Sequence, residues 1–214
     1  MAAELHRTLG DEPAVLLGER ALWLPAHAAL LIADLHLGKA DVFRRAGIAL
    51  PRGGTDSDLQ RLQRLIAHTG CTQLWILGDM LHGPLNAGAW LQQWRDVRAR
   101  HARLAVHLLR GNHDRMASAQ ALQVSVHAQA RLGGLVLRHE PAADPGGAHV
   151  LAGHVHPQIA LPGLSRRFPA FWLQTSMTIL PAFSRFTAGV TPALQRGEQL
   201  VACVEGELVA LPPR

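Results

Sequence analysis

The chain has 214 residues, of which 48% are hydrophobic and 17% charged, and it carries only two cysteines, Cys71 and Cys203. This composition excludes a disordered chain, a collagen-like chain and a disulfide scaffold, because it is apolar enough to form a core and shows no glycine period. The net charge is +5 and Lys39 is the only lysine, so the arginine excess fits either a phosphate-bearing partner or a genome-wide bias in composition.

The first residues do not resemble a secretory signal peptide, since charged side chains interrupt any apolar run there, namely Glu4, Arg7, Asp11 and Glu12. No segment approaches the roughly 18 to 20 apolar residues of a membrane span. Two distant cysteines suit a reducing compartment. We therefore expect a single domain over residues 1–214, located in the cytoplasm and without a membrane partner.

The first half of the chain alternates between predicted strands and helices. Residues 14–17 and 21–24 read as a hairpin, and the apolar run 28–33 reads as a buried strand. A helix is predicted from a cap at Thr55, with apolar residues at three- and four-residue spacing, until Gly70 ends it. Residues 73–77 then read as a second buried strand.

A second helix is predicted from Trp90, followed by a strand over residues 104–109. Hairpins dominate the remaining chain, where short strands are predicted over residues 124–128, 135–138, 149–152, 172–174, 200–205 and 207–211. The order β-α-β-α-β followed by hairpins indicates a sheet-rich α/β sandwich.

Residues that can bind metal cluster directly after the predicted strands, where ligands of such sheets usually bind. They are Asp34, His36, Asp79, Asn112, His139, His154 and His156. Oxygen and nitrogen ligands without thiolate suit Mn²⁺, Fe or Zn²⁺. Seven side chains exceed what one ion normally takes, so we predict two divalent ions bridged by Asp79.

Two of these clusters place ligands two residues apart, Asp34 with His36 and His154 with His156. In extended backbone, both side chains of such a pair point to the same face, so each pair is expected to reach one ion. Glycines precede three of the clusters, where a Cβ would obstruct a sharp turn or a close approach, at Gly78, Gly111 and Gly153.

The alternative interpretation is that these histidines are ordinary surface or core residues, which holds for most isolated histidines, and a lone Asp-x-His pair is common. Chance would rarely produce both the run Gly111-Asn112-His113-Asp114 and the run Gly153-His154-Val155-His156 in one chain. Two divalent ions and two carboxylates would leave a positively charged site, which attracts phosphate.

In their order along the chain these motifs resemble the calcineurin-like metallophosphoesterase superfamily, over roughly residues 28 to 160. The resemblance implies a four-layer αββα sandwich with two mixed β-sheets and a dinuclear centre, often containing Mn²⁺. It assigns one ion to Asp34, His36, Asp79 and His156, and the other to Asp79, Asn112, His139 and His154.

Further motifs resemble one bacterial branch, the ligase-associated DNA damage response endonucleases, whose relatives accompany a ligase, a helicase and an exonuclease. They are Leu35-His-Leu-Gly-Lys39, Phe43-Arg-Arg-Ala-Gly47 with Pro51, Leu137-Arg-His-Glu-Pro141 and Pro181-Ala-Phe-Ser-Arg-Phe-Thr187. The resemblance implies DNA as substrate, a role in DNA repair, and those three enzymes as partners.

The expected mechanism is direct attack of a metal-bridging hydroxide on a phosphodiester. His113 would protonate the leaving oxygen, Asp114 would orient the His113 ring, and His82 is either a neighbour of the metal ligands or a surface residue. Two other functions stay open: a small-molecule phosphatase or nucleotide hydrolase with the same centre, and a metal-bound scaffold subunit of a repair complex.

Two groups of arginines are candidates for contacts with nucleic acid. Arg44, Arg45 and Arg52 follow the first metal cluster, whereas Arg166, Arg167 and Arg185 lie in the second half of the chain. Either group can equally be a solvated surface. Aromatic residues make up only 5% of the chain, so we expect backbone-driven binding rather than sequence readout.

Overall fold

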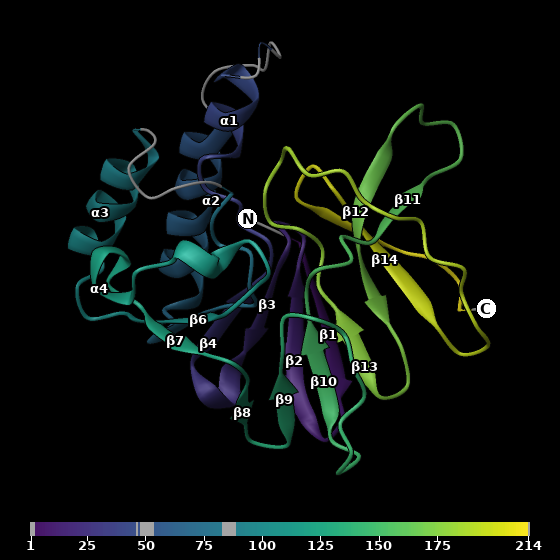
Figure 1. Cartoon of the computed structure of the whole chain (residues 1–214). Coiled ribbons are helices and arrows are strands. Elements are labelled where there is room, and N and C mark those ends of the chain that lie inside the picture. Colours follow the sequence, from purple (N-terminus) through teal and green to yellow (C-terminus); the bar gives the residue numbers. More distant parts are fainter. Residues whose placement is uncertain (1–2, 46, 48–53, 83–88, 214) are drawn as a thin grey trace.

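Two mixed β-sheets pack face to face in the computed structural model of the chain, which describes residues 3–45, 47, 54–82 and 89–213 (Figure 1). The first sheet has the strand order β1 (Glu4–Leu9), β2 (Glu12–Leu17), β3 (Ala21–Leu24), β4 (Ala29–Ile32), β5 (Gln73–Ile76), β6 (Ala105–Leu109) and β7 (Ser125–His127). Strands β1 to β4 pair antiparallel, and β4 to β7 pair parallel.

The second sheet has the order β15 (Glu207–Ala210), β14 (Gln199–Val204), β12 (Arg167–Leu173), β13 (Met177–Ile179), β10 (His149–Ala152), β9 (Leu135–Leu137) and β8 (Ala130–Leu132). Strand β11 (Gln158–Ala160) pairs with β12. Only the β13–β10–β9 segment is parallel. The inner faces of the sheets share one apolar layer that includes Leu31 and Trp75 from the first and Leu151 and Phe171 from the second.

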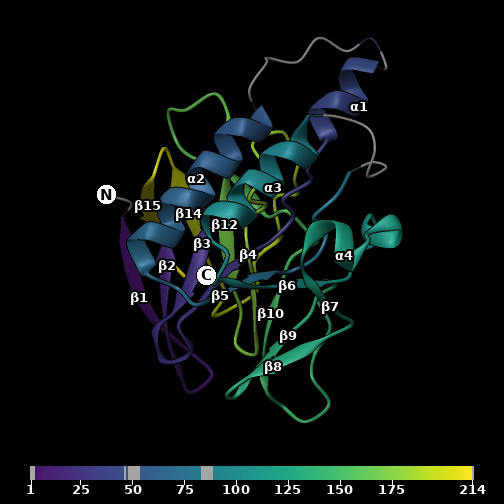
Figure 2. The ribbon, with the colours of Figure 1, turned by 90° about the vertical axis from the view of Figure 1, so that its left-hand side faces the viewer.

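Helices α2 (Gly54–Thr69) and α3 (Trp90–Arg100) cover the outer face of the first sheet, as Figure 2 shows. The shorter helices are α1 (Lys39–Arg45) and α4 (Ala119–Leu122), and 3₁₀ turns lie at Pro25–His27 and Asp114–Met116. The apolar stripe of α2 packs against β4 and β5 through residues such as Leu62 and Leu65. None of the helices in the described ranges is long and apolar enough to cross a lipid bilayer.

The predicted α/β class with two mixed sheets is confirmed, as are the β2–β3 hairpin and the termination of α2 before Gly70. The helix begins at Gly54, so Thr55 lies in its first turn. The second helical layer of the expected four is not formed by the described residues, which contain no helix after Leu122. The outer face of the second sheet instead carries a small apolar cluster around Val150 and Ile179, and Val155 and Trp172 pack against this cluster.

Candidate metal centre

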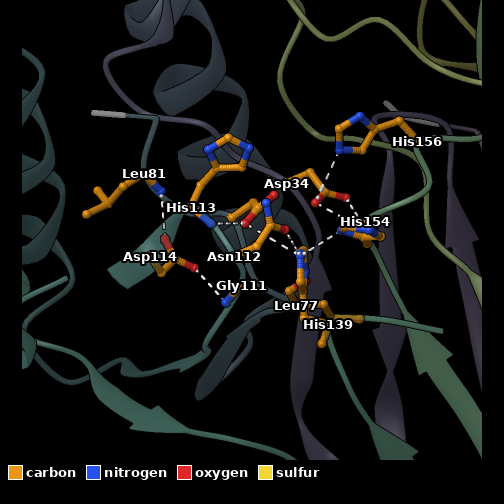
Figure 3. Close-up of polar contacts among 11 residues, drawn as sticks. Asp34, Leu77, Leu81, Gly111, Asn112, His113, Asp114, His139, His154 and His156 are labelled. Atoms are coloured by element: carbon orange, nitrogen blue, oxygen red, sulfur yellow. Dashed lines mark hydrogen bonds and ion pairs between the residues drawn. The ribbon is translucent and has the colours of Figure 1, made fainter. Parts of the chain in front are cut away.

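The predicted ligands meet at one edge of the sandwich, where strands of both sheets end. Asp34 and His36 follow β4, Asp79 follows β5, and Asn112 follows β6, all in the first sheet. From the second sheet, His139 follows β9, whereas His154 and His156 follow β10. Figure 3 labels five of these ligands, whose side chains point toward a common region: Asp34, Asn112, His139, His154 and His156. The site therefore depends on the packing of one sheet against the other.

Six of these residues form two groups whose ligand atoms lie within 4.8 Å of one another. One triad is Asp34, His36 and His156, and the other is Asp79, His139 and His154. Each triad combines residues from both sheets. The division matches the two ligand sets that the family resemblance implies, apart from the shared role of Asp79 and the place of Asn112.

In the Asp79 triad, atoms that can offer lone pairs to a cation converge. His139 Nδ1 donates to the Leu77 carbonyl at 2.9 Å, so in the neutral ring its Nε2 carries a lone pair. That Nε2 lies 3.1 Å from Asn112 Oδ1, 3.1 Å from His154 Nδ1 and 3.5 Å from Asp79 Oδ1. The short distance from His139 Nε2 to Asn112 Oδ1 places Asn112 beside this triad. Lone pairs that are directed at one point suit a cation.

The Asp34 triad is more deeply buried. Asp34 is 0% and His36 is 3% exposed, and both ring nitrogens of His36 are buried without a hydrogen bond. His156 Nδ1 donates to the Ala188 carbonyl at 3.1 Å, and its Nε2 faces Asp34 Oδ1 at 3.3 Å. Burying the His36 imidazole without hydrogen-bond partners costs free energy, and a metal ion bound to one of its nitrogens would offset that cost.

Charge and burial shift the pKa values of the two histidines of this triad in opposite directions. Burial, followed by the charge of Lys39, lowers the pKa of His36 to about 2, so the ring is neutral and able to ligate. Burial also acts to lower the pKa of His156, but its hydrogen bond and ion pair with Asp34 outweigh burial and raise that pKa. A proton and a metal ion therefore compete for His156 Nε2.

The backbone at the ligand positions differs from the extended segments that the sequence predicts. Five ligand residues adopt left-handed backbone with positive φ: Asp34 (55°), His36 (48°), Asp79 (47°), His154 (70°) and His156 (52°). The predicted alternation along a strand is therefore wrong, because the strands end before these residues. Left-handed backbone is costly for residues with a side chain and concentrates at functional sites.

The three glycines that precede the ligand clusters serve close approach, as their spacing predicts. A Cβ on Gly78 would lie 2.1 Å from His139 Nδ1, and one on Gly111 would lie 2.2 Å from Asp79 Oδ1. A Cβ on Gly153 would meet Asp34 Oδ2 at 2.9 Å. Larger residues would displace the ligands themselves.

The predicted catalytic pair occupies the loop after β6. The His113 backbone N–H donates to Asp79 Oδ1 at 3.0 Å, and its exposed ring lies 5.5 Å from the His36 ring. Asp114 is buried and accepts the backbone N–H groups of Gly111 and Leu81, each at 3.0 Å. These bonds hold the loop in shape, and the orientation of the His113 ring by Asp114 stays a prediction. Burial raises the pKa of the Asp114 carboxyl above its ordinary value.

His82 lies beside the predicted centre, with its ring 5.3 Å from that of His36 and 5.0 Å from that of His113. Burial, followed by the charge of Lys39, lowers its pKa to about 4. Sequence reasoning did not select Lys39, whose pKa is lowered by burial while Asp34 and Asp79 act to raise it. Its signal was available: it is the only lysine, and it closes the motif that begins at Leu35.

The two predicted arginine groups differ in their surroundings. Arg44 is paired with Asp41, whereas the side chain of Arg45 and all of Arg52 lie outside the described residues. Arg166, Arg167 and Arg185 instead line a cavity of about 570 Å³, which is also lined by His156. Contacts of either group with nucleic acid stay a prediction.

Comparison with known proteins agrees with this geometry. The family model of the calcineurin-like phosphoesterases matches residues 28–154. The crystal structure of the Pseudomonas putida nuclease MPE is 36% identical, with a TM-score of 0.85 over 98% of this chain and 100% of that one. YfcE, a phosphoesterase from E. coli, is 18% identical with a TM-score of 0.49, over 87% of this chain and 99% of its own. No curated protein matches the chain.

The family match covers more than half of the chain and includes every predicted metal ligand except His156. Both candidate triads lie at the strand ends that this match spans or directly follows. The chain belongs to the calcineurin-like phosphoesterase family and is a metal-dependent phosphoesterase.

Proposed function

We propose that the chain is a dinuclear-metal-dependent phosphodiesterase that cleaves DNA. One observation carries the proposal: two adjacent triads direct acceptor atoms inward. His154 links the triads, because its ring belongs to the Asp79 triad while its backbone N–H donates to both Asp34 oxygens, at 3.2 and 3.0 Å. Ions in the two triads would therefore be neighbours.

The ligand sets that we propose follow these contacts. Asp34, His36 and His156 would hold one ion, and His139, His154 and Asn112 the other, with Asp79 shared between them. Mn²⁺ is our first choice, since carboxylate, amide and imidazole ligands without thiolate suit it, and the same set accommodates Fe or Zn²⁺.

When bound, a pair of divalent cations polarises a phosphoryl oxygen and activates water as a nucleophile at neutral pH. The chain supplies the remaining functions. The exposed His113 imidazole would protonate the leaving oxygen, which requires a ring held near the centre. The hydrogen bond from His113 N to Asp79 provides that connection, and the buried Asp114 holds the loop in shape.

DNA as substrate is supported by the likeness to a protein described as a nuclease and by the net charge of +5. A role in DNA repair, association with a ligase, a helicase and an exonuclease, and a cytoplasmic location stay predictions. So does the organisation of residues 1–214 as a single domain.

The proposal is tested by adding Mn²⁺ to EDTA-treated protein and comparing plasmid DNA, bis(p-nitrophenyl) phosphate and p-nitrophenyl phosphate as substrates. We expect metal-dependent nicking of DNA and a preference for the diester over the monoester. Turnover restricted to the monoester or to free nucleotides would favour a small-molecule hydrolase. Two bound ions without turnover of any substrate would favour a scaffold.

A further inference from the structure

A cavity of about 570 Å³ lies beside the candidate metal centre, and His156 forms part of its wall. Five arginines line it: Arg20, Arg61, Arg166, Arg167 and Arg185. They come from distant parts of the chain, namely the turn between β2 and β3, helix α2, the start of β12 and the segment after β13. Folding therefore brings together about a quarter of the chain's 21 basic residues at one place.

The cavity has an excess of positive charge. Glu19 and Glu205 are the acidic lining residues, and Asp58 pairs with Arg61 from behind the wall, so five arginines face three carboxylates, leaving two positive charges. Glu205 is engaged with Arg166 at 2.5 Å. Within the described ranges, Arg20, Arg167 and Arg185 have no carboxylate within 4.0 Å of their guanidinium groups. An anion entering the cavity would find charges that are not already paired.

The floor of the cavity is held in place from behind. Arg61 is 2% exposed, donates to Asp58 at 3.0 Å and to the Phe183 carbonyl, and lies 4.0 Å from the centre of the Phe183 ring. Its buried Nε, 3.8 Å from Glu19 Oε2, makes no hydrogen bond. Arg20 Nη1 donates to the Ser184 carbonyl at 3.1 Å. Fixed guanidinium groups with a spare N–H suit an oxyanion.

We propose that this cavity binds a phosphate group of a nucleic-acid strand adjacent to the phosphodiester that is cleaved at the metal centre. The inference rests on the proposed function. Metal ligands offer lone pairs to cations, whereas the cavity offers N–H donors, which match the acceptor oxygens of phosphate. Since His156 belongs to both, the two sites adjoin, and a substrate that places one phosphate in each carries at least two. The cavity would thus favour a strand over a small diester with one phosphate.

The same chemistry would accept the diphosphate of a free nucleotide, and the experiment must separate the two sources. The test variant is Arg167→Gln with Arg185→Gln, because both side chains are exposed and their removal leaves the buried Arg61 in place. The control is Arg103→Gln, an equally exposed arginine that precedes β6, at the opposite end of that strand from Asn112.

Binding is measured by fluorescence anisotropy of a labelled single-stranded 12-mer in EDTA, so that the result does not depend on turnover. We expect the double variant to raise Kd about tenfold and to reduce the salt slope by about two, one for each lost phosphate contact. Arg103→Gln should change neither value. Unchanged binding in the double variant, or an equal loss in Arg103→Gln, would overturn the proposal.

Two further readouts complete the test. In Mn²⁺, the ratio of kcat/KM for DNA to that for bis(p-nitrophenyl) phosphate should fall about tenfold in the double variant. An unchanged ratio would contradict the inference, as would ADP that competes as strongly as the 12-mer. Absence of diester hydrolysis in the unmodified chain would count against the proposed function, while the anisotropy measurement would still decide whether the cavity binds a strand.

Discussion

The metal centre and the arginine cavity share His156 but have opposite chemistry. The centre gathers acceptors, including Asp34, Asp79 and the Nε2 atom of His139, whereas the cavity gathers guanidinium donors such as Arg20 and Arg61. The first suits cations and the second suits anions. In a nucleic-acid strand that lies across both, the phosphodiester to be cleaved would lie at the metal centre and the adjacent phosphate would lie in the cavity. Changes in the centre should therefore affect all substrates, and changes in the cavity should affect long ones.

The largest effect is expected from Asp79→Asn, which keeps the size of the side chain and removes its charge. We expect hydrolysis of every substrate to fall by roughly 10⁴-fold or more, since the metal-dependent step is lost. Bound metal should fall in parallel when it is measured by inductively coupled plasma mass spectrometry. Full Mn²⁺-dependent hydrolysis by this variant would refute the shared role of Asp79.

His113→Ala should separate chemistry from metal binding. The exposed ring is not a member of either triad, so the metal content should stay that of the unmodified chain. We expect kcat to fall about 100- to 1,000-fold, because a general acid is lost. The loss should shrink for a leaving group such as p-nitrophenolate, which needs no protonation. An equal loss for all leaving groups would assign His113 a structural role.

Gly78→Ala tests whether the close approach at the centre is needed. Its new Cβ would lie 2.1 Å from His139 Nδ1, so we expect the affinity for one ion to fall about 10- to 100-fold, as when the partner of a metal ligand is lost. Gly163→Ala is the matched control: its φ of 77° resembles the 83° of Gly78, and nothing lies within 4 Å of the Cβ that it would gain. Titration with Mn²⁺ followed by calorimetry would measure both. Equal losses would point to backbone strain alone.

The smallest effect is expected from Arg44→Gln. Arg44 is exposed and forms an ion pair with Asp41, so it must leave that partner to contact a phosphate. An ion pair between exposed groups contributes little free energy. We expect Kd for the 12-mer to change less than about threefold, given the fraction of a kcal/mol that such pairs contribute. A loss as large as that of the cavity double variant would transfer the strand-binding role to the first arginine group.

The sequence predicted the half of the fold that consists of long, regular elements. Buried runs such as β4 and β5, and the spacing of Leu62 and Leu65 in α2, are strong local signals. The elements that were missed are short or lie at edges, including β1, α1, β11 and β13. A strand of three residues such as Met177–Ile179 is defined by its neighbours rather than by its own pattern.

The ligand residues were predicted because they follow these runs, but their geometry was not. Asp34 and His36 reach the centre through left-handed backbone, which Asp and His adopt more often than most residues but which their spacing along the chain does not indicate. Arg61 was missed as well, although Asp58, Arg61 and Leu65 lie on one face of α2. Charged residues at core positions of an amphipathic helix were the available signal for the cavity, and only the packed structure shows what they face.

The most direct test is the number of Mn²⁺ ions that the metal-free chain binds, measured by calorimetric titration. We expect two ions per unmodified chain, one after His156→Ala and one after His139→Ala, because each variant removes a ligand from a different triad. A single ion bound by the unmodified chain, or two ions retained by either variant, would contradict this expectation.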